Sequence, residues 1–186
     1  MSDDLDKLLN PPNIPPGQRR WKGRIDITIH RNGEWSYGGT PIARREMVAL
    51  FARQLLVKDG HYYLDAPEQL LRIEVEDLPF TIVGLQVEGE GYKQLLEVVT
   101  NCDERIAIGA EHPLVLLPMP GVADKGSMGS AKEESLPAVL VRDGLYARFS
   151  RNCYYQLASL ANEIEVDNER TMQVCSGGIF FSIGAC

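Results

Sequence analysis

The amino-acid sequence predicts an α+β fold built around a duplicated unit of hairpin, helix and strand. Three observations lead to this prediction. Apolar residues alternate along much of the chain, two segments have helical periodicity, and the order hairpin, helix, strand occurs near both ends. A chain of 186 residues can bury a sizeable core, and this length allows either one domain or two.

The first unit begins with a segment in which every second residue from 25 to 29 is isoleucine, as on one face of a strand. Asn32-Gly33 follows, and an Asn-Gly step between strand-like runs predicts a hairpin. Residues 44 to about 56 predict a helix, because their apolar positions form one stripe. Gly60 is expected to end this helix, and residues 61–64 then return as a strand.

The centre of the chain holds five short apolar runs with turn residues between them. Their regular spacing predicts an antiparallel meander. Residues 120–135 follow, and their small side chains predict a mobile loop. The five runs are residues 71–75, 80–87, 95–100, 105–108 and 114–117.

The end of the chain repeats the order of the first unit. Residues 139–146 place Arg and Asp before a turn glycine, as residues 27–35 place Arg and Asn. A second helix is expected from Arg151, and the offset that aligns the two apolar stripes also lays Arg151 on Arg44. Each copy is expected to close with an aromatic strand after a glycine, which is Gly60 in the first copy and Gly178 in the second. This agreement in order predicts a duplication.

Residues 1–20 are expected to be a flexible arm outside the fold. Three leucines at positions 5, 8 and 9 precede a proline-rich stretch that prevents a helix from continuing. A frayed terminus is the favoured interpretation. The alternative is that the leucines dock on the body of the protein or on a second subunit.

The balance of charge excludes several kinds of partner. The formal net charge is −7, which gives no cationic field to attract nucleic acid or anionic lipid. The chain opens with acidic residues where a signal peptide would be basic, and no apolar stretch is long enough to span a bilayer. We therefore expect a cytoplasmic protein that binds neither nucleic acid nor membrane.

Cysteine and histidine spacing gives no sign of a metal site or a cofactor. The four cysteines, Cys102, Cys153, Cys175 and Cys186, lack the paired spacing of zinc or redox sites. We expect them to be reduced thiols, with a redox-sensing pair as the alternative. The three histidines, His30, His61 and His112, lie too far apart in the sequence to suggest shared metal ligation.

His112 is the best histidine candidate for catalysis. It follows Glu111 in a turn, and Asp103 lies one short strand away, so an acid and a base could meet in a hydrolase site. The favoured interpretation is nevertheless that these residues hydrogen-bond the backbone of their own turns.

Two arginines at helix starts suggest a binding site for an anion. Arg44 and Arg151 lie where the helix dipole is positive, a position that disfavours a cation. Helix-start amides and a guanidinium together suit phosphate or carboxylate. The favoured interpretation of the arginines themselves is that a nearby carboxylate, such as Glu46 or Asp77, neutralises them.

Short motifs spread from Trp21 to Ile183 make the chain resemble a Gram-negative bacterial family, the domain of unknown function 1285. Each motif is weak, but their order and coverage are specific. The matching residues are Trp21, Gly23, Asp26-Ile27, Pro41-Ile42, Arg44, Val75-Glu76-Asp77-Leu78-Pro79-Phe80, Thr100-Asn101, His112-Pro113-Leu114, Arg142, Gly144, Ser176-Gly177-Gly178 and Phe180-Phe181.

The resemblance implies two consecutive domains with a duplicated core, the second loosely similar to pleckstrin-homology folds. It also implies a ligand site between the domains that suits a nucleotide-like molecule, and a role in signalling. We expect an α+β domain over residues 21–78 and a β-rich domain with a late helix over residues 79–186. The sequence departs from the family pattern at Val174-Cys175 and in the insertion from Gly121 to Ser135, so its ligand could differ.

We predict a non-catalytic module that binds a small anionic, nucleotide-like ligand. The alternatives are the hydrolase built on His112 and a protein-interaction module, which would need an exposed apolar patch. The arginines would supply charge, Asn101 and Asp103 hydrogen bonds, and Ser176 with Gly177 a close approach of the backbone. The candidate ligand-binding residues are Arg44, Asn101, Asp103, His112, Arg151, Ser176 and Gly177.

Overall fold

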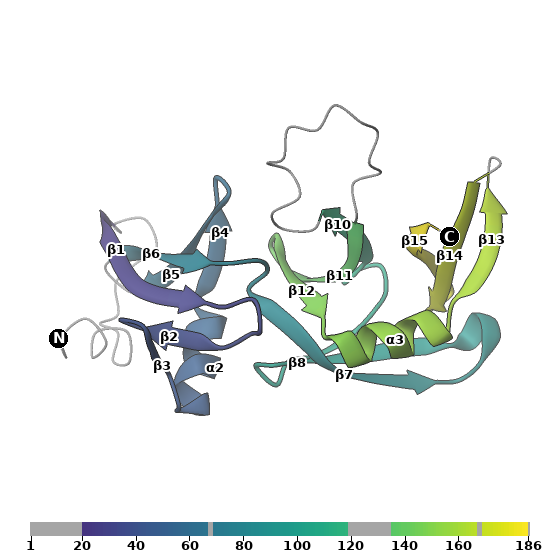
Figure 1. The fold of residues 1–186 in the computed structure, drawn as a ribbon, viewed down its shortest axis with the longest axis horizontal. Coiled ribbons are helices and arrows are strands. Elements are labelled where there is room, and N and C mark those ends of the chain that lie inside the picture. The colour runs from purple at the N-terminus through teal and green to yellow at the C-terminus, as the bar shows by residue number, and fades with distance from the viewer. Residues whose placement is uncertain (1–19, 67–68, 119–134, 167–168, 186) are drawn as a thin grey trace. The chain divides into compact units, whose positions relative to one another are not determined.

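A computed structural model describes residues 20–66, 69–118, 135–166 and 169–185. The chain divides into two compact units, unit 1 (Met1–Pro79) and unit 2 (Phe80–Cys186) (Figure 1). The expected arm and the expected loop lie outside the described residues except for Arg20 and Ser135, which belong to strands.

The predicted α+β class, with a helix-containing duplicated core and a second domain like a pleckstrin-homology fold, is wrong. The described part of the chain is mostly β, with fifteen strands and two α-helices of nine residues each. Part of the expected first helix is a strand, because the helix ends at Arg53 and a strand begins at Leu55. Short apolar runs such as this one cannot be assigned to helix or strand by periodicity alone.

Unit 1 contains one curled six-stranded sheet with the strand order β3-β2-β1-β6-β5-β4 (Figure 1). Neighbouring strands are antiparallel except for β1 and β6, which pair in parallel. This parallel pair joins the first described strand of unit 1, β1, to its last strand, β6. The elements are β1 (Arg20–Ile29), β2 (Trp35–Tyr37), β3 (Thr40–Pro41), α2 (Arg45–Arg53), β4 (Leu55–Lys58), β5 (His61–Ala66) and β6 (Gln69–Val75).

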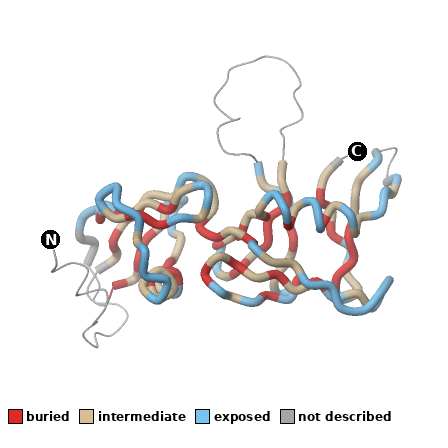
Figure 2. The backbone as a smooth tube through the Cα atoms, turned by 60° about the horizontal axis from the view of Figure 1, so that its bottom comes forward, coloured by how far each residue is buried: buried red, intermediate tan, exposed pale blue. Residues whose placement is uncertain are grey.

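One face of the unit 1 sheet buries the core. Ile27, Ile29 and Trp35 on β1 and β2 are almost fully buried, as is Phe51 of α2. The rings of Trp35 and Phe51 lie 6.4 Å apart between centroids, so α2 is anchored on this face. Removing a side chain such as Phe51 from water contributes about 1.5–3 kcal/mol. Figure 2 marks such buried stretches in red along the strands.

Unit 2 contains a six-stranded and a three-stranded sheet, with strand orders β10-β11-β12-β7-β8-β9 and β13-β14-β15. β12 and β7 are parallel, and the other neighbours are antiparallel. Four of the five expected central runs are strands of this unit, and the fifth, residues 71–75, belongs to β6 of unit 1. The predicted meander of all five is wrong, because β6 lies in another sheet and β9 and β10 occupy opposite edges of this one. The elements are β7 (Phe80–Glu88), the 3-10 turn η1 (Gly91–Lys93), β8 (Leu95–Thr100), β9 (Arg105–Ala107), β10 (Leu114–Pro118), β11 (Ser135–Arg142), β12 (Leu145–Phe149), α3 (Arg151–Ser159), β13 (Asn162–Val166), β14 (Glu169–Ser176) and β15 (Ile179–Ala185).

The single α-helix described in unit 2, α3, packs along β7 and β12 (Figure 1). Its Cys153 and Leu157 are buried, one helical turn apart, on the face toward the sheet. β15 packs against β10 and β11, so the small sheet covers part of the larger one. The core of this unit is therefore shared by both sheets and the helix.

Among the described residues, four two-residue hairpin turns have positive φ at both central positions. Such turns twist in the sense that suits the adjoining strands, and glycine adopts this conformation without strain. They join β2 to β3, β4 to β5, β11 to β12, and β14 to β15. The turn residues are Gly38 and Gly39, Asp59 and Gly60, Asp143 and Gly144, and Gly177 and Gly178.

The predicted duplication fails in its strand pairing. Gly60 lies in the first hairpin after α2, whereas Gly178 lies in the second hairpin after α3, so the two aromatic strands are not equivalent. In unit 1 the last strand joins the sheet of the first hairpin, but in unit 2 the last three strands form a sheet of their own. A glycine followed by aromatic residues marks a hairpin strand without specifying its place in the order.

Candidate functional site

The start of α2 lacks the usual side-chain cap. Arg44 occupies the N-cap position with extended backbone angles, and its side chain accepts no hydrogen bond from the helix. Ser, Thr, Asp or Asn at this position would satisfy one of the free amides, and arginine has no acceptor with which to do so. Among the described residues, the amides of Arg45 and Glu46 have no hydrogen-bond partner.

Two guanidinium groups lie next to these amides in the sequence. Arg44 and Arg45 are both exposed, and among the described residues neither forms an ion pair. Glu46 in the first turn complements the helix dipole but forms no ion pair with either arginine. The expected neutralisation of Arg44 by Glu46 is thus absent as a direct contact, and the start of α2 keeps an excess of positive charge.

The start of α3 differs from that of α2. Ser150 caps it, because its hydroxyl accepts a hydrogen bond from the Cys153 amide at 3.4 Å. Arg151 is exposed at the first helical position, as the sequence suggested. One amide of this helix start is therefore already satisfied, which makes α3 the weaker anion candidate. Arg44 and Arg151 belong to different units.

Ser176 and Gly177 hold the small sheet of unit 2 to β8. The buried Ser176 hydroxyl donates to the Ile108 carbonyl at 2.7 Å and accepts from the Leu96 amide at 2.9 Å. The Gly177 amide donates to the Gln94 carbonyl at 2.8 Å. The close approach predicted at this Ser-Gly step exists, but its partner is the protein's own backbone.

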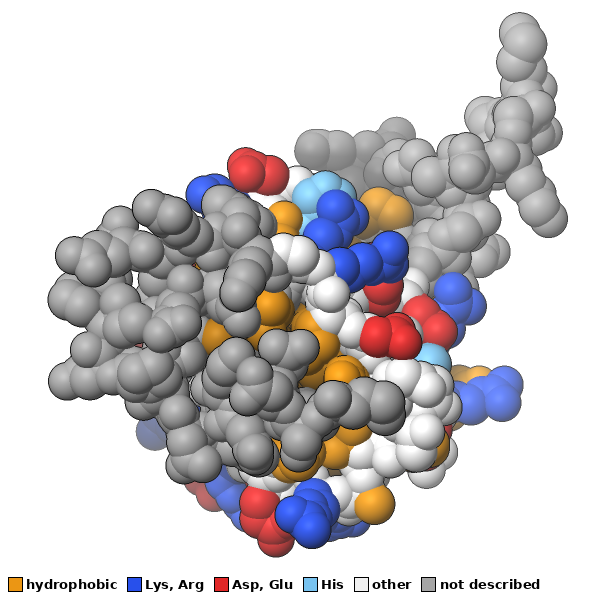
Figure 3. Space-filling model, turned by 90° about the vertical axis from the view of Figure 1, so that its left-hand side faces the viewer, with side chains coloured by type: hydrophobic (Ala, Val, Ile, Leu, Met, Phe, Trp, Pro, Cys, Tyr) orange, Lys and Arg blue, Asp and Glu red, His pale blue; other side chains and the backbone are white. Residues whose placement is uncertain are grey.

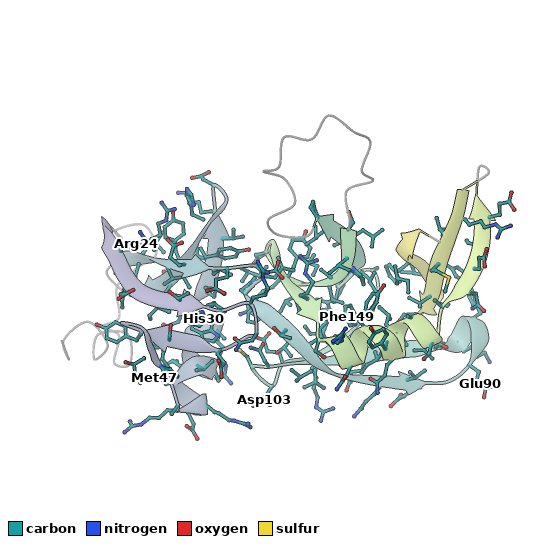
Figure 4. All side chains as sticks on the ribbon, viewed as in Figure 1. Arg24, His30, Met47, Glu90, Asp103 and Phe149 are labelled. Atoms are coloured by element: carbon teal, nitrogen blue, oxygen red, sulfur yellow. The ribbon has the colours of Figure 1, made fainter. Side chains whose placement is uncertain are left out.

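Asn101 and Asp103 form the turn between β8 and β9. The Asn101 side-chain oxygen accepts a hydrogen bond from the Thr81 backbone amide at 3.0 Å. The backbone amide of Asn101 donates to the Thr81 carbonyl at 2.8 Å. Asp103 is exposed and has a φ of 62°. Figure 4 shows Asp103 and Glu90 at the two ends of the β7–β8 hairpin. Asn101 thus fixes the beginning of β7, which is a structural role.

His112 is bound to the backbone of β11. Its Nδ1 lies 3.1 Å from the Leu140 carbonyl, and since a carbonyl only accepts, Nδ1 carries the proton. No hydrogen bond or ion pair joins His112 to Asp103 or Glu111 within the part of the chain that the structure describes. The pairing that the hydrolase alternative requires is not formed.

The three described cysteines, Cys102, Cys153 and Cys175, are free and buried. Burial, followed by the nearby charges of Glu104 and Asp103, raises the pKa of the Cys102 thiol to about 12. A thiol with so high a pKa is a poor nucleophile at neutral pH. Cys102 therefore behaves as a core residue.

The outer face of the unit 1 sheet carries an exposed ion pair. Arg24 pairs with Glu74, whereas Arg72 forms a hydrogen bond of 3.0 Å with His61 Nδ1, a contact that does not neutralise its charge. Figure 3 shows side chains of both signs next to one another on the surface. Pairs this exposed contribute only about 0–1 kcal/mol each. The charge of Arg24 is therefore compensated by a carboxylate, in contrast to the charges at the start of α2.

A cluster of His30, Ser36 and Glu76 was not predicted from the sequence. His30 bridges Ser36 and Glu76, with 2.9 Å on each side. The Asn-Gly hairpin register places His30 and Ser36 near each other and is readable from the sequence. Glu76 arrives only through the parallel pairing of β1 with β6, for which the sequence carries no local signal.

No group of metal-ligating side chains gathers within the described ranges. None of the helices in them is long and apolar enough to cross a membrane.

Two family models together match most of the chain. The N-terminal domain of DUF1285, a domain of unknown function, matches residues 16–78, and the C-terminal domain of the same family matches residues 79–183. A crystal structure of a DUF1285 family protein from Silicibacter pomeroyi DSS-3 is 31% identical, with a TM-score of 0.74, and the match covers 94% of this chain and 90% of that one. The chain belongs to the DUF1285 family.

A second DUF1285 structure, from Shewanella baltica OS155, shares the fold at 24% identity and a TM-score of 0.53. That match covers 73% of this chain and 91% of that one. The comparison with curated proteins gave no match. The predicted family resemblance is confirmed, and the function of the DUF1285 family is unknown.

Proposed function

We propose that this DUF1285 protein is a binding module for a small anionic ligand, and that the start of α2 receives the ligand's negative charge. The observation that carries this proposal is the pair of exposed arginines, Arg44 and Arg45, at a helix start without a side-chain cap. A phosphate or carboxylate there would accept from the amides of Arg45 and Glu46 and would pair with a guanidinium.

Electrostatics favours this location over the arginines that already have a carboxylate partner. Arg24, Arg105 and Arg142 are each paired with a glutamate, whereas the charges at α2 have no such partner. Two like charges beside the positive end of a helix dipole repel each other and the dipole. A bound anion would relieve this repulsion, so the helix start would be more stable when occupied. The nucleotide-like ligand and the signalling role that the family resemblance implies fit a phosphate-bearing molecule.

Thermal unfolding with a panel of anions tests the proposal. The panel contains inorganic phosphate, pyrophosphate, mononucleotides, cyclic dinucleotides and simple carboxylates. A ligand at about 100 times its Kd should stabilise the fold by about 2.7 kcal/mol. Replacing both arginines, Arg44→Gln with Arg45→Gln, should abolish the shift in Tm while leaving the unliganded Tm within a few degrees.

Arg53→Gln is the matched control, because Arg53 is exposed on the last turn of the same helix. This variant should keep the ligand-induced shift. Absence of a shift for every anion, or equal shifts in wild type and the double variant, would contradict the proposal.

An interaction module is a second candidate because unit 2 exposes an apolar patch. Tyr92, Leu95 and Phe180 have exposed fractions of 70%, 36% and 59%, and the two rings lie 6.3 Å apart between centroids. Such a patch suits an apolar protein surface. Sedimentation over a range of concentrations tests whether this surface is a second copy of the chain. Association that is lost in Tyr92→Ser with Phe180→Ser would support this role, and a monomer at all concentrations would exclude self-association.

A further inference from the structure

We propose that Ser36, His30 and Glu76 form a nucleophilic site that hydrolyses small carboxylic esters. This inference goes beyond ligand binding at α2 and uses none of the residues assigned to that role. It rests on a hydrogen-bonded chain in unit 1 that runs from a hydroxyl through an imidazole to a carboxylate. This order of groups is what activates serine in hydrolases of unrelated folds, where geometry rather than sequence position identifies it.

Three different strands of the unit 1 sheet supply the residues. Ser36 is the middle residue of β2, His30 directly follows β1, and Glu76 directly follows β6. The Glu76 amide donates to the Ile29 carbonyl at 3.0 Å, which holds the ends of β6 and β1 together. The carboxylate and the imidazole thus extend from adjacent, fixed strand ends (Figure 4 labels His30).

The hydrogen bonds set the tautomer that a general base requires. His30 Nδ1 lies 2.9 Å from Glu76 Oε1, and the Glu76 Oε2 atom accepts from the Arg31 amide at 3.0 Å. The Arg31 amide bond and then the His30 bond lower the pKa of Glu76, so it is a carboxylate at neutral pH. A carboxylate only accepts, so Nδ1 carries the proton. In the neutral ring Nε2 is then the acceptor, and it faces the Ser36 hydroxyl oxygen at 2.9 Å.

The low exposure of Ser36 restricts the site to small substrates. Ser36 is 4% exposed as a residue, whereas the side chains of His30 and Glu76 are 38% and 47% exposed. The buried Ser36 hydroxyl therefore contacts an imidazole that is itself partly exposed to solvent. A compact acyl group is the substrate class that suits such a position, and a bulky or polymeric ester does not.

The reaction balances without any cofactor. The Ser36 Oγ attacks the ester carbonyl carbon while its proton passes to Nε2 of His30. The tetrahedral adduct then expels the alkoxide, which takes that proton and leaves as an alcohol. Water, deprotonated by the same nitrogen, attacks the acyl-serine, releases the carboxylic acid and restores the hydroxyl. Glu76 acts as a positioning residue that holds the ring and balances the imidazolium charge.

Labelling of the folded protein with a small fluorophosphonate, followed by peptide mass mapping, tests the proposal. We expect one adduct per chain, on Ser36, and hydrolysis of a chromogenic acetate ester that Ser36→Ala abolishes. His30→Gln and Glu76→Gln should slow labelling about 100-fold, the scale of general-base catalysis. The pH profile of the labelling rate should differ between wild type and Glu76→Gln, because the carboxylate stabilises the imidazolium that forms.

Glu74→Gln is the matched control, because Glu74 lies on β6 two residues before Glu76 and pairs with Arg24 instead. It should leave labelling unchanged. The proposal is wrong if Ser36 of the folded wild-type protein stays unlabelled. It is also wrong if the labelling rate is unchanged in both His30→Gln and Glu76→Gln, because the three residues would then only hold the strands together. Neither result bears on anion binding at α2, whose test uses Arg44 and Arg45.

Discussion

At the scale of single residues, buried hydrogen bonds decide which polar side chains are structural. Ser176 is the clearest case, because its fully buried hydroxyl satisfies one donor and one acceptor of the backbone. Asn101 does the same for Thr81 at the beginning of β7. The sequence suggested both residues as candidates for ligand binding. The turn chemistry was recognisable there, but its backbone partners lie far along the chain and became visible only in the fold.

Ser176→Ala should destabilise unit 2. The substitution leaves the Leu96 amide and the Ile108 carbonyl buried without this partner, and each such loss costs about 1–3 kcal/mol. Ser159→Ala is the control, since that exposed hydroxyl bonds only within its own helix and should change stability by less than about 0.5 kcal/mol. Urea unfolding measures both variants. Equal stability of the two would show that the Ser176 bonds contribute nothing.

Glu76→Gln should change the pH dependence of stability. The pKa of Glu76 is lowered below its ordinary value of 4.5 in the folded protein, first by the Arg31 amide and then by His30. This stabilisation is therefore fully present above about pH 4.5 and disappears as the pH falls through the lowered folded pKa. The stability difference between wild type and variant should be largest near neutral pH and should shrink in acid. Thermal unfolding between neutral and acidic pH checks this, and a constant difference would contradict it.

At the scale of elements, turns and strands were more predictable than helices. Asn32-Gly33 predicts the first hairpin correctly, and the five central runs are all strands, because turn chemistry and alternation are local signals. The residues after Arg53 were assigned to a helix because an apolar run such as Leu55-Leu56-Val57 suits either structure. Tertiary pairing with β5 decides that they form a strand.

The short helix α3 should depend on one buried side chain. Leu157 is fully buried against the sheet, so Leu157→Ala should destabilise the protein by about 2–5 kcal/mol. Gln156→Ala is the control on the same helix, because Gln156 is exposed and its change should stay within about 0.5 kcal/mol. Chemical denaturation provides the comparison. A small effect of Leu157→Ala would mean that the packing of α3 is not essential to unit 2.

At the scale of the whole molecule, the pairing of strands that are distant in the sequence is the feature that the sequence could not predict. The parallel contacts of β1 with β6 and of β12 with β7 join segments tens of residues apart, and no local pattern encodes them. The first of these contacts also brings Glu76 to His30. The candidate anion site is the opposite case. Arg44 was identified from the sequence because a cation at a helix start is unfavourable, and this signal is local.

The net charge of −7 sharpens the test of the anion site. A protein that is acidic overall repels anions at long range, so any binding must come from a local concentration of positive charge. The effect of a bound anion should therefore be confined to the first turn of α2. General adsorption of an anion would instead disturb scattered surface residues.

An NMR titration of the backbone amides with pyrophosphate tests the central claim most directly. We predict saturable shifts of the Arg45 and Glu46 amide signals, the two donors at the uncapped start of α2. These shifts should be lost in the double variant Arg44→Gln with Arg45→Gln and kept in Arg53→Gln. If these two amide signals stay fixed, or if the largest shifts fall elsewhere in the protein, the start of α2 is not an anion site.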